Sequence, residues 1–465
     1  MNFSLQASAS RIFLWQRANH AIYLARNILL ALYITPAEFG DFAIALNLAT
    51  YIAIFGTLEF RTAFFTTKEL TPEQLRAQWS AEVTLSALTL ILGLLLSPWL
   101  ATTRAGGIVT AMLCLLVVNL IEASFSTHLY LLEKDLRFPF ITALYTVVNL
   151  VSFIVCLALA IMGWGLGALV ADRLIAASAK WFVLGRKSDW RPQFQIELRS
   201  LLHYWSSIRV LFLNGLLGKV LFGFDIYAIG KWIGSEANGI YAMAMKWAML
   251  PMELGAGFLA IMALSLYSRQ SHDNMETFRA SYTEVTFYIV RFCLAIAVLM
   301  TIFMSDFFRV FYRNDWQAVP AIFCALLPYA MFRPLYQNVC QALQARKILW
   351  PIFWVMVVQS ILVVALILLS ISSGLVCVAL AAGAALGLGY IALELHLHRS
   401  ARHPLVFLFA APLVLAALAA ATHLLMAHNS GFGVRVGLAA AYGAIAAWEW
   451  WSGRRRFSKP PASAS

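Results

Sequence analysis

The chain has 465 residues, of which 62% are hydrophobic and only 12% are charged, and its mean hydropathy is +0.77. A water-soluble protein of this composition would expose more apolar surface than such proteins tolerate. The formal net charge of +12 would suit a nucleic-acid-binding protein. The basic residues, however, are concentrated beside apolar segments, so we expect membrane lipids and not nucleic acid around this protein.

About fourteen apolar segments follow one another along the chain. Each is long enough to cross a hydrocarbon layer of about 30 Å as an α-helix. Their expected limits are 12–33, 39–60, 79–100, 107–131, 139–162, 165–185, 205–230, 238–266, 283–304, 318–343, 349–371, 375–397, 404–426 and 436–452. The sequence therefore predicts an all-α polytopic membrane protein.

Lysine and arginine are concentrated at both ends of the chain and in every second loop, for example at Arg61, Lys134 and Arg186. The opposite loops carry few basic residues, among them Arg104 and Arg435. The positive-inside rule places the basic loops in the cytoplasm. We therefore expect a multi-pass membrane protein with both termini in the cytoplasm.

An internal repeat divides the chain into two halves. Residues 40–45 and 239–244 share a glycine that is followed by alanines three and five positions later. Six helices in each half give both halves the same orientation, so the repeat is parallel. The expected organisation is an N-terminal lobe over 1–185, a cytoplasmic linker over 186–204, a C-terminal lobe over 205–400, two further helices over 401–452 and a basic tail over 453–465.

Eight cations lie inside the apolar segments, where each costs about 2.5–3.5 kcal/mol at the bilayer centre. A water-filled cavity between helices would accommodate them, and a basic cavity would bind an anion. The candidates for binding an anionic headgroup are Arg26, Arg173, Lys219, Lys246, Arg291 and Arg333. The other two, Lys180 and Arg209, lie within reach of the cytoplasmic interface and could extend their charges to it. Nearby carboxylates could neutralise Arg173 and Arg291. The alternative to anion binding is that the charged residues form ion pairs whose only role is to hold the two lobes together.

Four carboxylates inside apolar segments are candidates for carrying a coupling ion, H⁺ or Na⁺. They are Asp225, Glu253, Glu59 and Glu122. Some charged residues belong to polar stripes at helical spacing, which are expected to face the bundle interior or water. The stripes are Asn19–Tyr23–Arg26, Asn119–Glu122–Ser126, Lys246–Glu253 and Arg333–Gln337–Gln341–Gln344.

Signs of catalysis are absent from the sequence. It contains no GxxxxGK[ST] motif for nucleotide phosphates, and its six cysteines form no CxxC pair. His396, His398 and His403 stand among arginines, which disfavours a metal ion there. We expect no metal, no cofactor and no enzymatic activity, and transport driven by an ion gradient.

Several motifs resemble those of a known family, the polysaccharide and O-antigen repeat-unit flippases. Residues 35–43, TPAEFGDFA, resemble the signature that follows the first helix of these flippases. Residues 238–246, NGIYAMAMK, followed by Leu250-Pro251, resemble their second-half segment. Residues 68–75, 316–320 and 343–346 are also similar, whereas Arg346-Lys347 replaces the usual Gly-Arg/Lys. The superfamily also contains multidrug extruders and lipid II flippases.

The resemblance implies export of undecaprenyl-diphosphate-linked oligosaccharide across the bacterial inner membrane, with Lys246 matching the cation of the family motif. The two lobes of the parallel repeat favour transport by alternating access. A glycan polymerase and glycosyltransferases are the expected partners. Two alternatives remain open at this point. A cation-coupled exporter of drugs would favour a carboxylate-rich cavity, and a non-transporting scaffold of a glycan assembly complex would need no central charges.

Overall fold

The computed structural model describes residues 2–55, 71–135, 137–187, 190–195, 198–256, 263–264, 266–268, 270 and 275–401. The elements formed by these residues are helices, and none of them is a strand. Two compact units divide the chain, Met1–Gly239 and Ile240–Ser465. Each unit is described by itself below.

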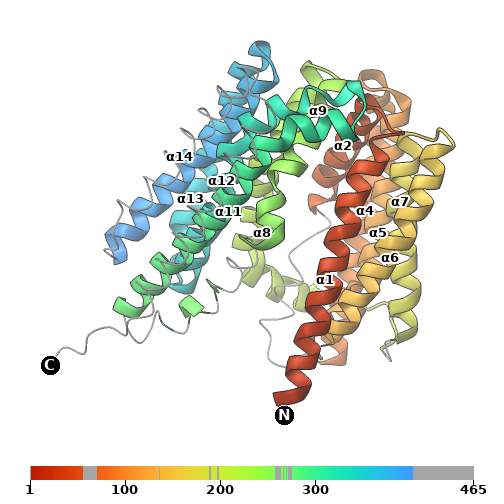
Figure 1. Cartoon of the computed structure of the whole chain (residues 1–465). Helices are drawn as coiled ribbons and strands as arrows, with labels where there is room; N and C mark the ends of the chain where they lie inside the picture. Colours follow the sequence, from red (N-terminus) through yellow and green to blue (C-terminus); the bar gives the residue numbers. More distant parts are fainter. Residues whose placement is uncertain are drawn as a thin grey trace. The chain divides into compact units, whose positions relative to one another are not determined.

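The first unit is a bundle of long helices (Figure 1). Its elements are α1 (Asn2–Leu30), α2 (Pro36–Ile52), the 3-10 turn η1 (Ala53–Phe55), α4 (Pro72–Thr103), α5 (Gly106–Lys134), α6 (Phe138–Ile161), α7 (Leu166–Lys187) and α8 (Leu198–Trp232), followed by the first residues of α9 (Ser235–Ala248). Helix α5 packs against α2, α4 and α7, while α6 packs against α1 and α7. Helix α8 contacts α2 and α4, so the seventh expected segment belongs to this compact unit. The expected lobe boundary at 186–204 stays a prediction.

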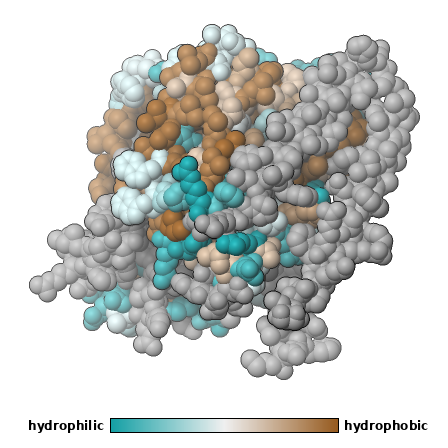
Figure 2. All heavy atoms as spheres, turned by 90° about the vertical axis from the view of Figure 1, so that its left-hand side faces the viewer, coloured by the Kyte–Doolittle hydropathy of each residue, from teal (hydrophilic) through white to brown (hydrophobic). Residues whose placement is uncertain are grey.

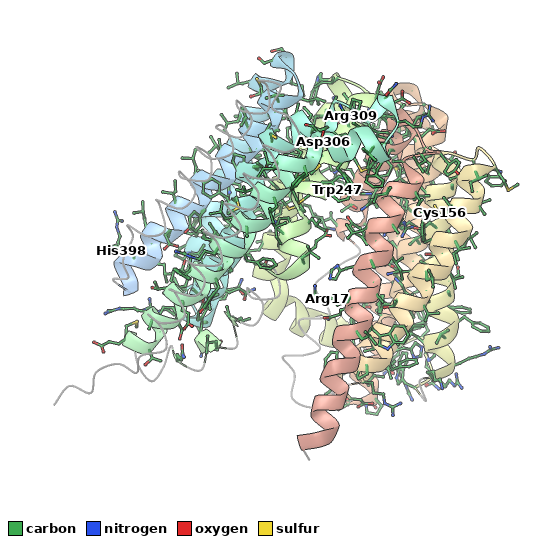
Figure 3. All side chains as sticks on the ribbon, viewed as in Figure 1. Arg17, Cys156, Trp247, Asp306, Arg309 and His398 are labelled. Carbon is green, nitrogen blue, oxygen red and sulfur yellow. The ribbon has the colours of Figure 1, made fainter. Side chains whose placement is uncertain are left out.

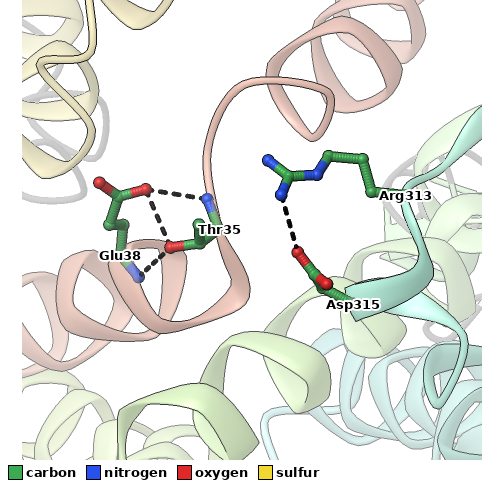
Figure 4. A network of polar contacts seen from close by, with 4 residues as sticks. All are labelled: Thr35, Glu38, Arg313 and Asp315. Carbon is green, nitrogen blue, oxygen red and sulfur yellow. Dashed lines mark hydrogen bonds and ion pairs between the residues drawn. The ribbon is translucent and has the colours of Figure 1, made fainter.

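Two helices of this unit begin at a Thr-Pro pair. At α2, Glu38 N donates to Thr35 Oγ1 at 3.3 Å, and Thr35 N donates to Glu38 Oε2 at 2.8 Å (Figure 4). At α4, Thr71 and Gln74 form the same reciprocal cap. Proline at the first helical position has no N–H to leave without a partner. These capping boxes fix where both helices start.

The second unit contains the end of α9, the π-helix η2 (Met252–Ala256), α11 (Met275–Phe311), the 3-10 turn η3 (Asn314–Trp316), α12 (Val319–Ala345), α13 (Trp350–Ser370), the 3-10 turn η4 (Ile371–Ser373) and α14 (Leu375–Ala401). Helix α14 packs against α12 and α13, and α12 packs against α11. In the loop before α12, Arg313 forms an ion pair with Asp315 at 3.2 Å (Figure 4).

The lengths and compositions of these helices confirm a polytopic, all-α membrane protein. Among the described residues, eight helices are long and apolar enough to span a membrane. Large apolar side chains stay exposed on several of them, including Leu95, Trp354 and Leu369. Apolar side chains cover much of the described surface in Figure 2, above a group of hydrophilic side chains. The segments expected at 404–426 and 436–452, and the basic tail, lie outside the described residues.

The segment expected as one helix over 238–266 differs from that prediction. Regular helix α9 ends at Ala248, and a π-helix begins at Met252. Pro251 has no backbone N–H and its ring disfavours a continuous α-helix at this point. The seven-residue spacing of Lys246 and Glu253 therefore does not correspond to two turns of one regular helix.

Candidate functional site

A charged cavity of about 220 Å³ lies inside the first unit. Helices α1, α2, α5, α6 and α7 contribute its lining, together with Ala53 of η1. Its charged lining residues are Arg26, Glu122, Asp172, Arg173 and Lys180, so three cations meet two carboxylates. The charges of ionised side chains in this cavity therefore sum to one positive charge.

An ion pair joins α1 to α7 at this cavity. Arg26 Nη2 contacts Asp172 Oδ2, and the two side chains are 20% and 4% exposed. Asp172 Oδ1 is buried and has no hydrogen-bond partner in the described part of the chain. The neighbouring Arg173 is more exposed and also lines the cavity. The expectation that a carboxylate neutralises Arg173 is not met by Asp172, because Asp172 pairs with Arg26.

A second, looser pair lies across the cavity between α5 and α7. Lys180 Nζ is 3.9 Å from Glu122 Oε1 and 4.7 Å from the centre of the Tyr145 ring. The Lys180 side chain is only 13% exposed, whereas that of Glu122 is 49% exposed. The Lys180 side chain thus lines the cavity and lies largely buried there.

Uncharged polar groups also line the cavity. Asn149 Nδ2 donates to Asn19 Oδ1 at 2.8 Å, which joins α6 to α1. Asn119 Nδ2 is buried without a hydrogen-bond partner among the described residues. Asn119 and Glu122 both line the cavity, as their helical stripe predicted. A buried amide donor without a partner is a group that a polar ligand could satisfy.

Lys219 lies beside this cavity, whereas Asp225 is enclosed elsewhere in the unit. Lys219 Nζ donates to the carbonyl of Thr50 at 3.4 Å, and Thr50 lines the cavity. The Tyr51 hydroxyl donates to the Lys219 carbonyl at 3.5 Å. Asp225 is 4% exposed and its Oδ1 accepts from Ile226 N at 2.8 Å.

The remaining candidates on described residues belong to the second unit. Arg291 stacks on the ring of Phe287, with its guanidinium carbon 3.3 Å from the ring centre. Lys246 and Arg333 are partly buried and Glu253 is exposed. Next to Lys246 lies Trp247, which is labelled in Figure 3. The Trp247 indole donates to the Tyr312 hydroxyl at 3.2 Å. Glu59 and the side chain of Arg209 lie outside the described residues.

One carboxylate of the first unit was missed by sequence reasoning. Glu82 of α4 is 6% exposed and contacts Ser126 of α5. A signal was present, because Glu82 lies within the expected segment 79–100 and Ser126 ends the stripe of Asn119 and Glu122. Nothing in the sequence indicates that α4 and α5 meet at Glu82 and Ser126.

No metal-binding cluster of three or more His, Cys, Asp or Glu residues occurs in the described part of the chain. The six cysteines are free, and Cys156 of α6 is buried (Figure 3). The chemistry available at the cavity is therefore that of cations, carboxylates and amides. Groups of these kinds can form charge-assisted hydrogen bonds with a charged polar molecule.

Comparison with known proteins gives matches in sequence and in fold. The family model "Polysaccharide biosynthesis protein" matches residues 29–320. The "Teichuronic acid biosynthesis protein TuaB" of Bacillus subtilis (strain 168) is 22% identical over 48% of this chain and 46% of its own length. The "Succinoglycan biosynthesis transport protein ExoT" of Rhizobium meliloti (strain 1021) is 22% identical over 53% of this chain and 50% of its own. These alignments span about half the length of those relatives.

Solved structures share the fold at low sequence identity. "Lipid II flippase MurJ, inward closed conformation" matches 96% of this chain and 99% of its own with a TM-score of 0.76 and 14% identity. A "multidrug resistance MATE family transporter of the MOP superfamily" matches 81% of this chain and 94% of its own with a TM-score of 0.56 and 13% identity. At these identities the likeness concerns the fold alone.

Proposed function

Because the chain belongs to the family of polysaccharide biosynthesis proteins, whose model matches more than half of it, we propose that it flips a lipid-linked oligosaccharide across the membrane. The passenger is an oligosaccharide repeat unit on undecaprenyl diphosphate, and the membrane is the bacterial inner membrane. The names of the related proteins, which concern teichuronic acid and succinoglycan, support a glycan passenger. The shared fold with a lipid II flippase supports a lipid-linked one.

The observation that carries this proposal is the cationic cavity of the first unit. A diphosphate is a compact anion, and arginine and lysine form charge-assisted hydrogen bonds with it. Arg26 is already paired with Asp172, whereas Arg173 has no ion pair among the described residues and Lys180 is held only loosely by Glu122. Arg173 and Lys180 are therefore the cations most available to a diphosphate. The amides of Asn119 and Asn149 are placed to bind sugar hydroxyls.

Transport in this proposal proceeds by alternating access and draws on an ion gradient. The sequence shows no nucleotide-binding motif, which supports a gradient as the energy source. Asp225, Glu253 and Glu122 are the described carboxylates proposed from the sequence as ion carriers. A glycan polymerase and glycosyltransferases are the proposed partners, and the proposed location of both termini is the cytoplasm.

Complementation of a deletion strain tests the passenger's charge. Arg173→Gln and Lys180→Gln should each weaken binding of the diphosphate, because one charge-assisted bond is worth about 1.5–3 kcal/mol, roughly tenfold or more in affinity. Surface glycan should fall in both variants and disappear in the double variant at equal protein level. Lys180→Arg should retain part of the activity. Lys187→Gln, an exposed position on the same helix, is the matched control and should leave glycan unchanged.

A binding assay separates transport from expression effects. Purified protein should bind undecaprenyl-diphosphate oligosaccharide more tightly than the same lipid without its diphosphate. Normal surface glycan from a well-expressed Arg173→Gln/Lys180→Gln variant would show that the cavity cations do not bind the passenger.

One observation favours a second candidate, a cation-coupled exporter of drugs. Asp172 is buried in the cavity and one of its oxygens has no partner among the described residues, so a lipophilic cation could bind there. Such an exporter should raise the resistance of a sensitive strain to cationic drugs. Asp172→Asn should remove that resistance, whereas a glycan flippase should change no drug sensitivity.

A further inference from the structure

A buried carboxyl group lies outside the charged cavity and has no part in the function proposed above. Glu82 lies about three turns from the start of α4 and is 6% exposed. Ser126 Oγ of α5 contacts its Oε2, and Gln78 Nε2 donates to its Oε1 at 3.3 Å. Within the described ranges, no Lys, Arg or His forms an ion pair with Glu82. An ionised carboxylate enclosed between helices without a cation is costly.

The hydrogen bonds of Ser126 indicate where a proton lies. Ser126 Oγ is also 2.9 Å from the carbonyl oxygen of Ala123 on α5. A hydroxyl group has one hydrogen to donate, whereas a carbonyl and an ionised carboxylate can only accept. Both contacts of Ser126 are hydrogen bonds only if Glu82 supplies the second hydrogen. In that arrangement Glu82 Oε2–H donates to Ser126 Oγ, Ser126 donates to Ala123 O, and Gln78 donates to Glu82 Oε1.

We propose that Glu82 is a proton-binding site of this transporter and that Ser126 transmits its protonation state to the cavity. The inference rests on the transport function proposed above, because it names H⁺ as the coupling ion and adds Glu82 to the carboxylates that carry it. Loss of the proton to water leaves a carboxylate that accepts the Ser126 hydrogen. Ser126 then releases the Ala123 carbonyl and bonds α5 to α4 by a charge-assisted hydrogen bond, which is stronger than the neutral one.

The helical stripe on α5 connects this proton site to the passenger cavity. Asn119, Glu122 and Ser126 follow one another at intervals of three and four residues, so they lie along one face of α5. The first two line the cavity and the third contacts Glu82. A change in how Ser126 holds α5 against α4 therefore acts on the helix that presents Asn119 and Glu122 to the passenger.

Other titratable groups near this part of α4 are engaged elsewhere. On α5, His128 is buried and packs edge-on against Trp190, 5.1 Å between ring centres. Arg191, next to Trp190, donates to the Gly185 carbonyl at 3.2 Å. The Tyr51 hydroxyl on α2 donates to the backbone carbonyl of Lys219 on α8, and Lys219 Nζ donates to the backbone carbonyl of Thr50 on α2. None of these groups forms an ion pair or hydrogen bond with Glu82 in the described part of the chain.

Infrared spectroscopy of the purified full chain tests the proton directly and needs no transport. At neutral pH the wild type should show the carbonyl band of a protonated carboxylic acid that is absent from Glu82→Gln and present in Glu73→Gln, an exposed control on the same helix. The band should disappear as the pH is raised. In Ser126→Ala, which keeps the carboxyl but removes its partner, the band should shift in frequency and disappear at a different pH.

Two spectroscopic results would overturn the assignment. One is a wild-type minus Glu82→Gln spectrum at neutral pH that contains only ionised carboxylate bands. The other is loss of the acid band on addition of sodium ions at constant pH, which would make Glu82 a sodium site. Ser126→Ala gives a readout even where Glu82→Gln fails to fold.

Transport measurements in proteoliposomes then separate this inference from the proposed function. A proton gradient should stimulate glycan transport by the wild type and by Glu73→Gln but not by Glu82→Gln, which keeps the shape of a protonated carboxyl. If the wild type moves no lipid-linked glycan but still shows the infrared band of the protonated acid, the proposed transport function is refuted and the proton site at Glu82 remains. Equal stimulation of Glu82→Gln and wild type would refute Glu82 as a coupling group.

Discussion

Gly40 and Gly239, the matching glycines of the internal repeat, face each other where the first turns of α2 and α9 meet. A Cβ atom on Gly40 would lie 2.8 Å from Gly239 N and would also overlap the carbonyl of Ser235. A Cβ atom on Gly239 would lie 3.0 Å from Gly40 N and would overlap the carbonyl of Pro36. Asn238 Nδ2 donates to the Gly40 carbonyl at 3.3 Å beside this contact. The repeated glycines thus allow two backbones to touch within the first unit.

Alanine at either glycine should therefore destabilise the protein. Each clash is with backbone, which cannot rotate away, and overpacking of this kind costs about 1–3 kcal/mol of unfolding free energy. Gly185→Ala is the matched control, because it lies in helix α7 and its Cβ would meet open space. Alanine there should stabilise the helix by about 0.5–1 kcal/mol. The measurement is thermal unfolding of purified Gly40→Ala, Gly239→Ala and Gly185→Ala. Unfolding temperatures of Gly40→Ala and Gly239→Ala at or above that of the wild type would contradict the clash.

The helices of this protein were predictable because membrane helices obey simple local rules. Apolar runs of sufficient length marked them, and Thr35-Pro36 and Thr71-Pro72 carry the capping chemistry that starts α2 and α4. The break after Ala248 was missed, although Pro251 was visible in the sequence. Its effect depends on whether neighbouring groups satisfy the freed carbonyls, which one segment alone does not reveal.

The site was only partly predictable, because spacing along one helix says nothing about which helix lies opposite. The stripes correctly placed Arg26, Asn119 and Glu122 at a polar interior. The choice of partner was not accessible from the sequence. Asp172 directly precedes Arg173 in the chain but pairs with Arg26 across the bundle. Glu82 was missed for the same reason, since its partner Ser126 lies on another helix.

The Arg26–Asp172 pair should show strong energetic coupling. Removal of one partner leaves the other charge buried, which costs about 3–5 kcal/mol, whereas replacing both with apolar residues of similar size is often neutral. Arg26→Met and Asp172→Leu should each lower the unfolding temperature markedly. The double variant should unfold closer to the wild type than either single variant. Additive losses in this double-mutant cycle would show that the two side chains do not stabilise each other.

The positive-inside bias predicts that both termini face the cytoplasm. A cysteine introduced by Arg455→Cys into the otherwise cysteine-free protein should resist a membrane-impermeant thiol reagent added to intact cells and react after the cells are opened. Arg104→Cys, in a loop expected on the opposite side, is the control and should react in intact cells. Labelling of position 455 from outside would reverse the proposed orientation.

Asp225 and Glu253 are expected to differ as carriers of a coupling ion. Asp225 is 4% exposed, whereas Glu253 is exposed and follows the end of regular helix α9. Replacing an ion-binding carboxylate by an amide should weaken ion binding more at a buried position than at an exposed one. At the buried position, water does not replace the lost interaction with the ion. Asp225→Asn should therefore reduce gradient-driven glycan transport in proteoliposomes more than Glu253→Gln does. Unchanged gradient dependence in both variants would remove these residues from the coupling mechanism.

Lys246 and Arg333 test whether the second unit also contributes cations to the passenger's diphosphate. Both are partly buried, and Lys246 matches the cation of the flippase motif. Each charge-assisted contact is worth about 1.5–3 kcal/mol, so Lys246→Ala and Arg333→Ala should each weaken passenger binding by roughly tenfold or more and lower surface glycan. Lys246→Arg should retain part of the activity because it keeps the charge, and Lys347→Ala, an exposed cation after α12, should have no effect. Normal glycan from a well-expressed Lys246→Ala/Arg333→Ala variant would confine diphosphate binding to the cavity of the first unit and make these two cations structural.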